Sequence, residues 1–254
     1  MPASQVHPDA STPRNAALDA VLRGIADASA AATRTQPARL LAVSKTRSAE
    51  EIAALAAAWS AQRRPDAPAP AFGENYVQET LAKQPALASL GLEWHLIGHL
   101  QSNKAKEAAI AYDWVQTVDR LKLIAALAAH RPLDRSPLNV MIQVNIDDET
   151  SKHGCRPEDI DALAAAVAAE PRLRLRGLMA IPAPDPDMGR RRAAFRRMHA
   201  LFATLAAQHS CVDTLSMGMS EDYALAIAEG ATMVRVGTAL FGPRPTPAAA
   251  ETAA

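Results

Sequence analysis

Lys45 is the residue of this sequence whose position most directly suggests chemistry. It closes a largely apolar run over residues 40–44, and a helical pattern follows at residues 48–61. Continuous apolar runs are typical of strands that are buried on both faces. At the end of such a strand, partial desolvation lowers the pKa of a lysine and frees the neutral amine that attacks an aldehyde. The alternative is a lysine whose stem packs on the strand while its amine stays in water.

Two later segments combine glycine with hydroxyl side chains just before predicted helices. Residues 216–220 surround Gly218 with small and flexible residues, and Gly237 with Thr238 precedes a short helical turn. Backbone N–H groups at helix starts, with the hydroxyls of Ser220 and Thr238, are suited to bind a phosphate. Two tight turns with capping hydroxyls would explain the same residues. An aldehyde-seeking lysine opposite a phosphate site favours pyridoxal 5′-phosphate (PLP).

These residues need a scaffold that brings strand ends together. Apolar runs predict eight strands, at residues 39–44, 71–73, 92–97, 114–118, 138–145, 173–181, 214–217 and 233–236. Helical patterns follow at residues 48–61, 76–90, 102–111, 120–130, 157–169, 188–209 and 221–229, and one helix precedes the first strand at residues 15–33. Ser48 with Glu51 predicts a capping box at the start of its helix.

This alternation predicts an α/β fold, a single (β/α)₈ TIM barrel with an extra N-terminal helix. The length of 254 residues suits one such domain. An open doubly wound sheet is the competing arrangement, but it seldom uses eight such regular units. We assign the barrel to residues 15–242 and expect disordered tails at residues 1–14 and 243–254. Function in a barrel gathers at the C-terminal ends of the strands.

Composition excludes several classes of partner. The formal net charge is zero, which gives no reason to expect a nucleic acid or a membrane surface as a partner. Cys155 and Cys211 are isolated, which fits a reducing compartment rather than a disulfide framework. The first residues lack the apolar core of a signal peptide, and no apolar run approaches the ~20 residues of a membrane span. We therefore expect a soluble, cytoplasmic protein, and a monomer because no apolar seam is visible.

Six segments near the predicted strand ends form a distinctive set. They are residues 42–45, 72–79, 94–104, 176–179, 215–222 and 234–242. In this order they closely resemble the YggS/PROSC family of PLP homeostasis proteins, over about residues 38–242. The resemblance implies a fold similar to the barrel domain of alanine racemase. Val236 stands where isoleucine is more usual, and residues 151–154 vary around Lys152, whose role stays open.

The resemblance also implies roles for seven residues. Lys45 would hold PLP as a Schiff base, and Asn75 would lie near the ring. Arg235 would face the pyridine nitrogen, and it shares a face of its strand with Gly237. The phosphate would be held by Met219, Ser220, Gly237 and Thr238.

Arg235 beside the ring nitrogen would have a chemical consequence. Arginine stays protonated and has no acceptor for the proton of a pyridinium. The ring nitrogen would then stay unprotonated, and the cofactor would be a poorer sink for carbanion charge. The alternative is an arginine that is salt-bridged across the barrel.

Two further patterns are weaker. His95 and His99 have the spacing that binds zinc on a helix, but residues 94–97 are predicted as strand and Gly98 interrupts them. We therefore expect no metal site. The basic run at residues 190–197 lies on a long predicted helix, where a solvated face is a better interpretation than a polyanion site.

Three functions are compatible with a PLP-type barrel to different degrees. The first is a carrier and buffer of PLP that supplies apo-enzymes, with little or no turnover. The second, the alternative, is a PLP-dependent amino-acid racemase, which needs a second acid or base on the opposite face of the substrate. In alanine racemases this group is a tyrosine from a C-terminal domain of a partner subunit. The chain ends soon after the eighth predicted strand, and none of its tyrosines matches that motif, so we expect the carrier. A metal-dependent hydrolase lacks carboxylate and histidine ligands at successive strand ends.

Overall fold

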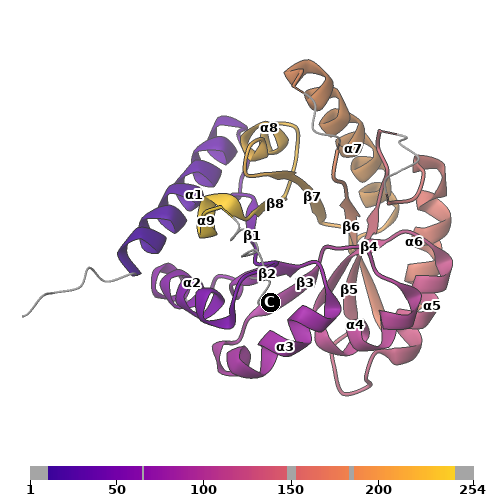
Figure 1. Cartoon of the computed structure of the whole chain (residues 1–254). Coiled ribbons are helices and arrows are strands. Elements are labelled where there is room, and N and C mark those ends of the chain that lie inside the picture. The colour runs from indigo at the N-terminus through magenta and orange to yellow at the C-terminus, as the bar shows by residue number, and fades with distance from the viewer. Residues whose placement is uncertain (1–10, 65, 148–152, 183–185, 244–254) are drawn as a thin grey trace, which may run out of the picture.

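The structure is a computed structural model that describes residues 11–64, 66–147, 153–182 and 186–243. Eight parallel strands close into a barrel in chain order, from β1 to β8 (Figure 1). The first four are β1 Arg39–Val43, β2 Ala71–Glu74, β3 Glu93–Leu96 and β4 Trp114–Val118. The others are β5 Leu138–Gln143, β6 Leu173–Met179, β7 Thr214–Met219 and β8 Met233–Val236.

The barrel is closed by the pairing of its first and last strands. Leu40 of β1 lies opposite Val234 of β8, and Ala42 lies opposite Val236. The predicted TIM barrel is therefore confirmed, and the open doubly wound sheet is excluded because the sheet has no free edge.

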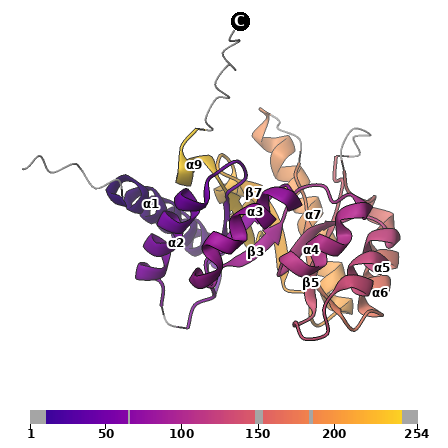
Figure 2. The same ribbon diagram turned by 60° about the horizontal axis from the view of Figure 1, so that its bottom comes forward.

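Helices surround the strands on the outside (Figure 2). The helices between strands are α2 Ala49–Gln62, α3 Val77–Leu87, α4 Ala105–Ala111, α5 Leu121–His130, α6 Ile160–Ala168, α7 Met188–Gln208 and α8 Tyr223–Ala228. Short 3₁₀ turns lie at η1 Ala88–Leu90, η2 Ser102–Lys104 and η3 Pro157–Asp159. The predicted capping box at Ser48 and Glu51 is confirmed, since each side chain accepts the other residue's backbone N–H. None of the described helices is both long and apolar enough to cross a membrane.

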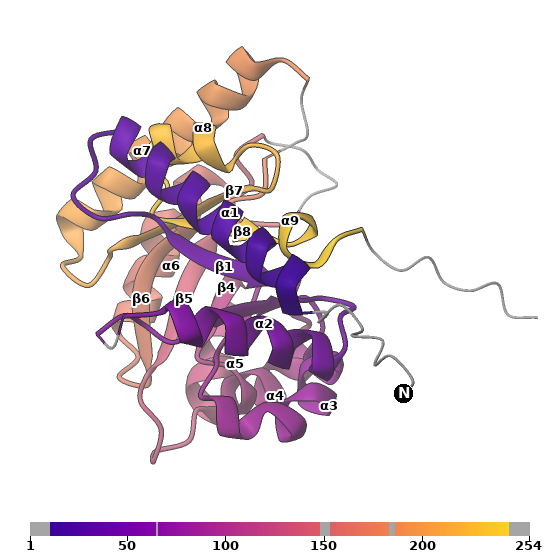
Figure 3. The ribbon, with the colours of Figure 1, turned by 90° about the vertical axis from the view of Figure 1, so that its left-hand side faces the viewer.

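The N-terminal helix α1 (Ser11–Ala31) covers the barrel where a full helix after β8 would otherwise lie. The helix after β8, α9 (Thr238–Phe241), has only four residues. Figure 3 shows α1 crossing this side, and it contacts α2, α8 and α9. The inner face of α1 is buried and consists of Leu18, Val21 and Ile25. An apolar stripe on α1 therefore completes the outer layer.

The predicted start of this helix, at residue 15, was wrong. The helix begins at Ser11, within the segment that we expected to be a tail. Polar residues and Pro13 hide the start, but proline is tolerated in the first turn because the N–H groups there have no intrahelical partner. The rest of both predicted tails, residues 1–10 and 244–254, lies outside the described residues.

Side chains that point into the barrel fill it in two groups. The first group consists of Leu41 from β1, Ala71 from β2, Met233 from β8 and Ile97, which follows β3. Trp114, Met141 and Met179 form the second group, from β4, β5 and β6. The alternate residues of the same strands pack outward against the helices in the main core. The barrel is therefore packed through its middle, which leaves chemistry to its ends.

Candidate functional site

The strand register brings the predicted site residues to one rim of the barrel. Val43 pairs with Gly73, and Ala42 pairs with Val236. Lys45, Asn75 and Gly237 thus follow immediately beyond the ends of neighbouring strands. We call the seven residues Lys45, Asn75, Met219, Ser220, Arg235, Gly237 and Thr238 the strand-end site. Their nearness follows from parallel pairing of β7, β8, β1 and β2.

Lys45 sits in a tight turn between β1 and α2 and is half-buried. The next residue, Thr46, has φ 64°, a left-handed conformation that costs energy for a side chain branched at Cβ. Its N–H donates to Glu79 Oε2 at 3.3 Å. This turn lets Lys45 leave the strand at the rim.

A buried ionic network supports this turn from outside the barrel, and the sequence analysis missed it. Ser44 Oγ donates to Glu74 Oε1 at 2.6 Å, and Lys83 Nζ donates to the two oxygens of Glu74 at 3.0 and 3.1 Å. Lys83 also donates to the Ser44 carbonyl at 3.3 Å. Burial raises the pKa of Glu74, and the bonds from Ser44 and Lys83 offset part of the rise. These bonds hold the end of β1, which precedes Lys45, against the end of β2, which precedes Asn75.

Arg235 is buried inside the barrel, at 4% exposure. Nη1 donates to Ser216 Oγ and Nη2 to the Ala180 carbonyl, each at 2.8 Å. Within the described residues these partners are a hydroxyl and a carbonyl, so a salt bridge across the barrel is not what holds it. Burial lowers the pKa of Arg235 to about 10, partly opposed by Asp222. The side chain therefore remains a cation at neutral pH, with its charge not neutralised by direct contact with a carboxylate.

Ser220, Gly237 and Thr238 lie together where β7 and β8 end. The Gly237 N–H points to Ser220 Oγ at 3.4 Å, a long and weak bond. A Cβ on Gly237 would lie 3.3 Å from both Cβ and the carbonyl oxygen of Val43, so the missing side chain allows β8 to approach β1. Thr238 is exposed, and α9 starts with no side-chain cap. The arrangement offers hydroxyls and backbone N–H groups to an anion.

Met219 fits the predicted phosphate role less directly. Its N–H donates to Asp222 Oδ1 at 2.7 Å, and its side chain is 41% exposed. The preceding Gly218 has φ 88°, and a Cβ there would meet the Ala226 Cβ at 2.4 Å. Glycine is therefore required for β7 to turn into α8 at this point. Met219 shapes the turn, but its N–H already has a partner.

Arg47 links the Lys45 turn to the last helix and is a second residue that the sequence analysis missed. Its Nη2 donates to the carbonyls of Gly242 and Pro243 at 2.6 and 2.9 Å. Its guanidinium also lies over the ring of Phe241, 5.5 Å from the centroid. The side chain is 8% exposed. No pattern in the sequence predicts a contact across 195 residues.

The two histidines of the predicted zinc-like spacing lie in different surroundings. His95 is buried in the barrel, with Nε2 2.6 Å from Glu93 Oε1 and Nδ1 2.9 Å from Gln116 Nε2. Burial is the main reason that its pKa is lowered. His99 is exposed at the rim, so the two rings do not face one another. Lys152, the other residue whose role the sequence left open, lies outside the described residues.

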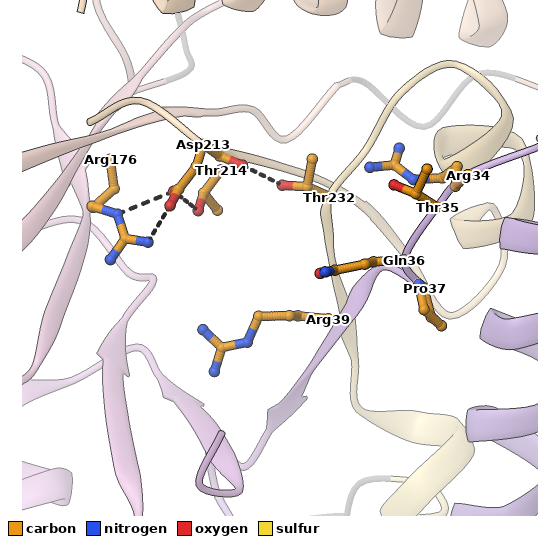
Figure 4. Close-up of a pocket in the computed structure, with 9 residues that line it drawn as sticks. All are labelled: Arg34, Thr35, Gln36, Pro37, Arg39, Arg176, Asp213, Thr214 and Thr232. Carbon is orange, nitrogen blue, oxygen red and sulfur yellow. Dashed lines mark hydrogen bonds and ion pairs between the residues drawn. The ribbon is translucent and has the colours of Figure 1, made fainter. Parts of the chain in front are cut away.

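A cavity of about 440 Å³ lies at the opposite end of the barrel, where strands begin (Figure 4). We call it the lower cavity; it is lined by Arg34, Thr35, Gln36, Pro37, Arg39, Arg176, Asp213, Thr214 and Thr232. Arg39 donates to Glu93 at 2.9 Å, and Arg176 Nε donates to Asp213 at 3.0 Å. None of its lining residues belongs to the strand-end site.

At the C-terminal rim of the barrel, a half-buried lysine and a buried arginine lie beside hydroxyls and the uncapped start of α9. The chain matches the family "alanine racemase, N-terminal domain" over residues 17–245. It is 50% identical over 223 residues to the pyridoxal phosphate homeostasis protein of Escherichia coli K12, covering 85% of this chain and 92% of that protein. The chain belongs to the family of pyridoxal phosphate homeostasis proteins, as its six sequence segments indicated.

Two solved structures are similar to this chain in both fold and sequence. A crystal structure of an unknown protein from Bifidobacterium adolescentis has a TM-score of 0.82 and 32% identity, and the match covers 94% of this chain and 99% of that one. The structure of PipY from Synechococcus elongatus PCC7942 with PLP bound has a TM-score of 0.69 and 37% identity, covering 86% and 100% of the two chains.

Proposed function

We propose that this protein binds PLP at the strand-end site and serves PLP homeostasis by holding the cofactor and releasing it to apo-enzymes. The observation that carries the proposal is the convergence of Lys45, Arg235, Ser220, Gly237 and Thr238 at one rim. The PLP-bound relative PipY and the homeostasis protein of E. coli support the choice of cofactor.

The residues at the rim fit the chemical groups of PLP. Bound PLP supplies an aldehyde on an electron-withdrawing ring. Lys45 would supply the amine that holds the cofactor through this aldehyde. Ser220, Thr238 and the N–H of Gly237 supply donors to the phosphate. Asn75, half-buried beyond β2, is proposed to contact the ring.

Arg235 limits what the site does with amino acids. Its guanidinium carries donors only, so beside the ring nitrogen it favours the unprotonated form. Its bonds to the Ser216 hydroxyl and the Ala180 carbonyl hold it in place. A cationic arginine here therefore weakens the electron-withdrawing power that amino-acid chemistry requires.

The tyrosines give little support to a racemase. Tyr112 is buried beside Thr80, outside the barrel interior, and burial raises its pKa. The Tyr223 hydroxyl packs against Gly24 of α1, where an added Cβ would lie within 2.3 Å. Tyr76 is 58% exposed at the start of α3 and is the tyrosine nearest in sequence to Asn75. We propose that none of these three tyrosines serves as a second acid or base for amino-acid chemistry, and that turnover is correspondingly small.

Covalent mapping tests the binding residue. Purified protein loaded with PLP is reduced with borohydride, digested and analysed by mass spectrometry. We expect the adduct on Lys45 and its loss in Lys45→Ala, while the exposed Lys106→Ala keeps it. An adduct that maps chiefly to another lysine in the wild-type protein would overturn the assignment.

A chiral assay tests the carrier against the racemase. After long incubation of the PLP-loaded protein with L-alanine in deuterated water, we expect faint or no exchange of the α-proton and no accumulation of D-alanine. Loss of one general acid or base typically costs about 10²–10⁴-fold in rate. Formation of D-alanine at many turnovers per second would favour the racemase, and its loss in Tyr76→Phe would then identify the second base.

A further inference from the structure

Two histidines and an aspartate meet at the same rim, away from the strand-end site. His99 follows β3, Asp119 follows β4, and His153 lies in the connection after β5. One ligand atom from each of the three side chains lies within 4.8 Å of the other two. The rings of His99 and His153 are stacked, with centroids 3.7 Å apart and planes 15° from parallel. We call these three residues the histidine cluster.

The three connections that carry the cluster are bound to one another. Thr117 Oγ1 donates to the Gly98 carbonyl at 2.9 Å, which joins the end of β4 to the residue before His99. Arg120 Nη1 donates to Asp119 Oδ1 at 2.6 Å, while its Nη2 donates to the Leu100 carbonyl at 2.9 Å. Asp119 and the His99 connection are thus held in register by one arginine.

His153 is also held close to the end of its strand. Its carbonyl accepts a hydrogen bond from Gln143 Nε2 at 3.3 Å. Two residues later, the backbone of Cys155 forms an isolated parallel β-bridge with Val144. The Cys155 N–H donates to the Gln143 carbonyl at 2.8 Å. These bonds use backbone atoms, so they leave the imidazole of His153 exposed at the rim.

We propose that the histidine cluster binds a divalent transition-metal ion of the zinc type, through the imidazoles of His99 and His153 and the carboxylate of Asp119. Two nitrogens and one oxygen suit Zn²⁺ and Co²⁺ better than Ca²⁺ or Mg²⁺, which prefer oxygen ligands. Three protein ligands leave one position of a tetrahedral ion for water or another ligand.

The present geometry is close to that of a bound site. Bonds of about 2.0–2.2 Å place tetrahedral ligand atoms about 3.3 Å apart, so the ligand atoms need to approach one another by at most about 1.5 Å. Rotation of the two exposed imidazoles supplies this movement without moving the strands. In the described part of the chain, the ring nitrogens of His99 have no hydrogen-bond partner. Arg120 occupies one oxygen of Asp119 and orients the carboxylate in the way that outer ligands usually do.

The test is a titration of the full-length, tag-free protein with Co²⁺ alone, after treatment with a chelator. The PLP-loaded protein is used, and the visible d–d bands of Co²⁺ report the ligand geometry while competition by Zn²⁺ reports affinity. We expect one ion per chain, and a weakening of about tenfold or more in His99→Ala, His153→Ala and Asp119→Asn. His130→Ala, which removes an exposed histidine at the end of α5, is the matched control.

Folding and cofactor content separate a lost site from a damaged protein. Each variant is compared by circular dichroism and by the absorbance of bound PLP, neither of which the exposed ligands should alter. The proposal is overturned if the wild-type protein binds no stoichiometric ion, or if the three variants bind Co²⁺ as tightly as His130→Ala. It does not depend on PLP transfer, since the ligands lie after β3, β4 and β5.

Discussion

The two ends of the barrel both collect arginines, but they treat the charge differently. In the lower cavity, Arg39 is bound by Glu93 and Arg176 by Asp213, and Arg176 also lies 4.5 Å from the centre of the Trp114 ring. At the rim, buried Arg235 has a hydroxyl and a carbonyl as partners. The lower cavity therefore pairs Arg39 and Arg176 with carboxylates, whereas Arg235 at the rim is held by a hydroxyl and a carbonyl.

This difference shows why a cavity alone does not identify a site. The lower cavity is large and lined with guanidinium groups, yet Arg39 and Arg176 are already paired with carboxylates. Arg34 is the exception, because its Nε is buried without a partner among the described residues, and burial lowers its pKa. The rim instead places the hydroxyls of Ser220 and Thr238 near the Gly237 N–H, whose bond to Ser220 Oγ is long, at 3.4 Å. Donors that the protein leaves available are therefore a better indicator of a binding site than the volume of a cavity.

The largest effect should come from removing the phosphate donors at the rim. Ser220→Ala combined with Thr238→Ala deletes two charge-assisted hydrogen bonds, each worth about 1.5–3 kcal/mol. We expect the affinity for PLP to fall by about 100-fold or more, and that for pyridoxal, which lacks the phosphate, to change little. Parallel titration of both ligands measures this. Thr35→Ala, an exposed hydroxyl of the lower cavity, is the control, and equal losses for the two ligands would contradict the phosphate assignment.

The next effect concerns stability and distinguishes the half-buried Glu93, near the lower end, from the buried Glu74, near the rim. Burial alone would raise the pKa of Glu93, but His95 and Arg39 together lower it from 4.5 to about 2. Glu93 therefore stabilises the fold above pH 4.5, and this contribution, up to about 3 kcal/mol, is lost as pH falls toward 2. Glu74 has a raised pKa, so its contribution is present below pH 4.5 and is lost as pH rises.

Urea unfolding at several pH values checks these opposite signs. Glu93→Gln should flatten the loss of unfolding free energy between pH 4.5 and pH 2, because the variant has no carboxylate to protonate. Glu74→Gln should flatten the decline that begins above pH 4.5. If both variants change the pH profile in the same direction, the contrast between the two glutamates is wrong.

The order and register of the barrel could be predicted because they depend on local patterns. Each apolar run that ends in polar residues gave a strand within a few residues of its observed bounds, and parallel pairing places the ends of β1 and β8 side by side. The exception was the start of α1, where polar residues and Pro13 concealed a helix whose stability comes from burial of Leu18 and its neighbours.

The contacts that the sequence did not predict join residues that lie far apart in the chain. The Ser44–Glu74–Lys83 network and the Arg47 contacts with Gly242 join segments whose side-chain directions no periodicity reveals. The expectation that successive strand ends lack histidine and carboxylate side chains was wrong, because His99, Asp119 and His153 follow β3, β4 and β5. They share no sequence motif, since they lie on three different connections. Whether Arg235 is paired with a carboxylate was likewise open until its partners were known. The roles of the strand-end residues toward PLP remain predictions.

A smaller effect is expected from Arg47, which positions the last helix rather than contacting the cofactor. Arg47→Ala removes the bonds to Gly242 and Pro243 and should let α9, with Thr238, move away from the Lys45 turn. We expect about a tenfold loss of PLP affinity with a smaller loss for pyridoxal. Arg47→Lys should recover part of the loss. Arg64→Ala, an exposed arginine paired with Asp66, is the control, and identical affinities for Arg47→Ala and this control would rule out the positioning role.

The smallest effect on PLP should come from Arg34 at the lower cavity. The five residues of β1 separate the two ends by about 16 Å, which exceeds the Debye length of about 8 Å at physiological salt. Arg34→Ala should therefore leave the affinity for PLP within about twofold of the wild-type value. Titration at low and at physiological salt tests this, because a long-range charge effect would grow as salt is removed. A tenfold loss at physiological salt would show that the two ends are coupled, and the lower cavity would then have to be included in the account of cofactor binding.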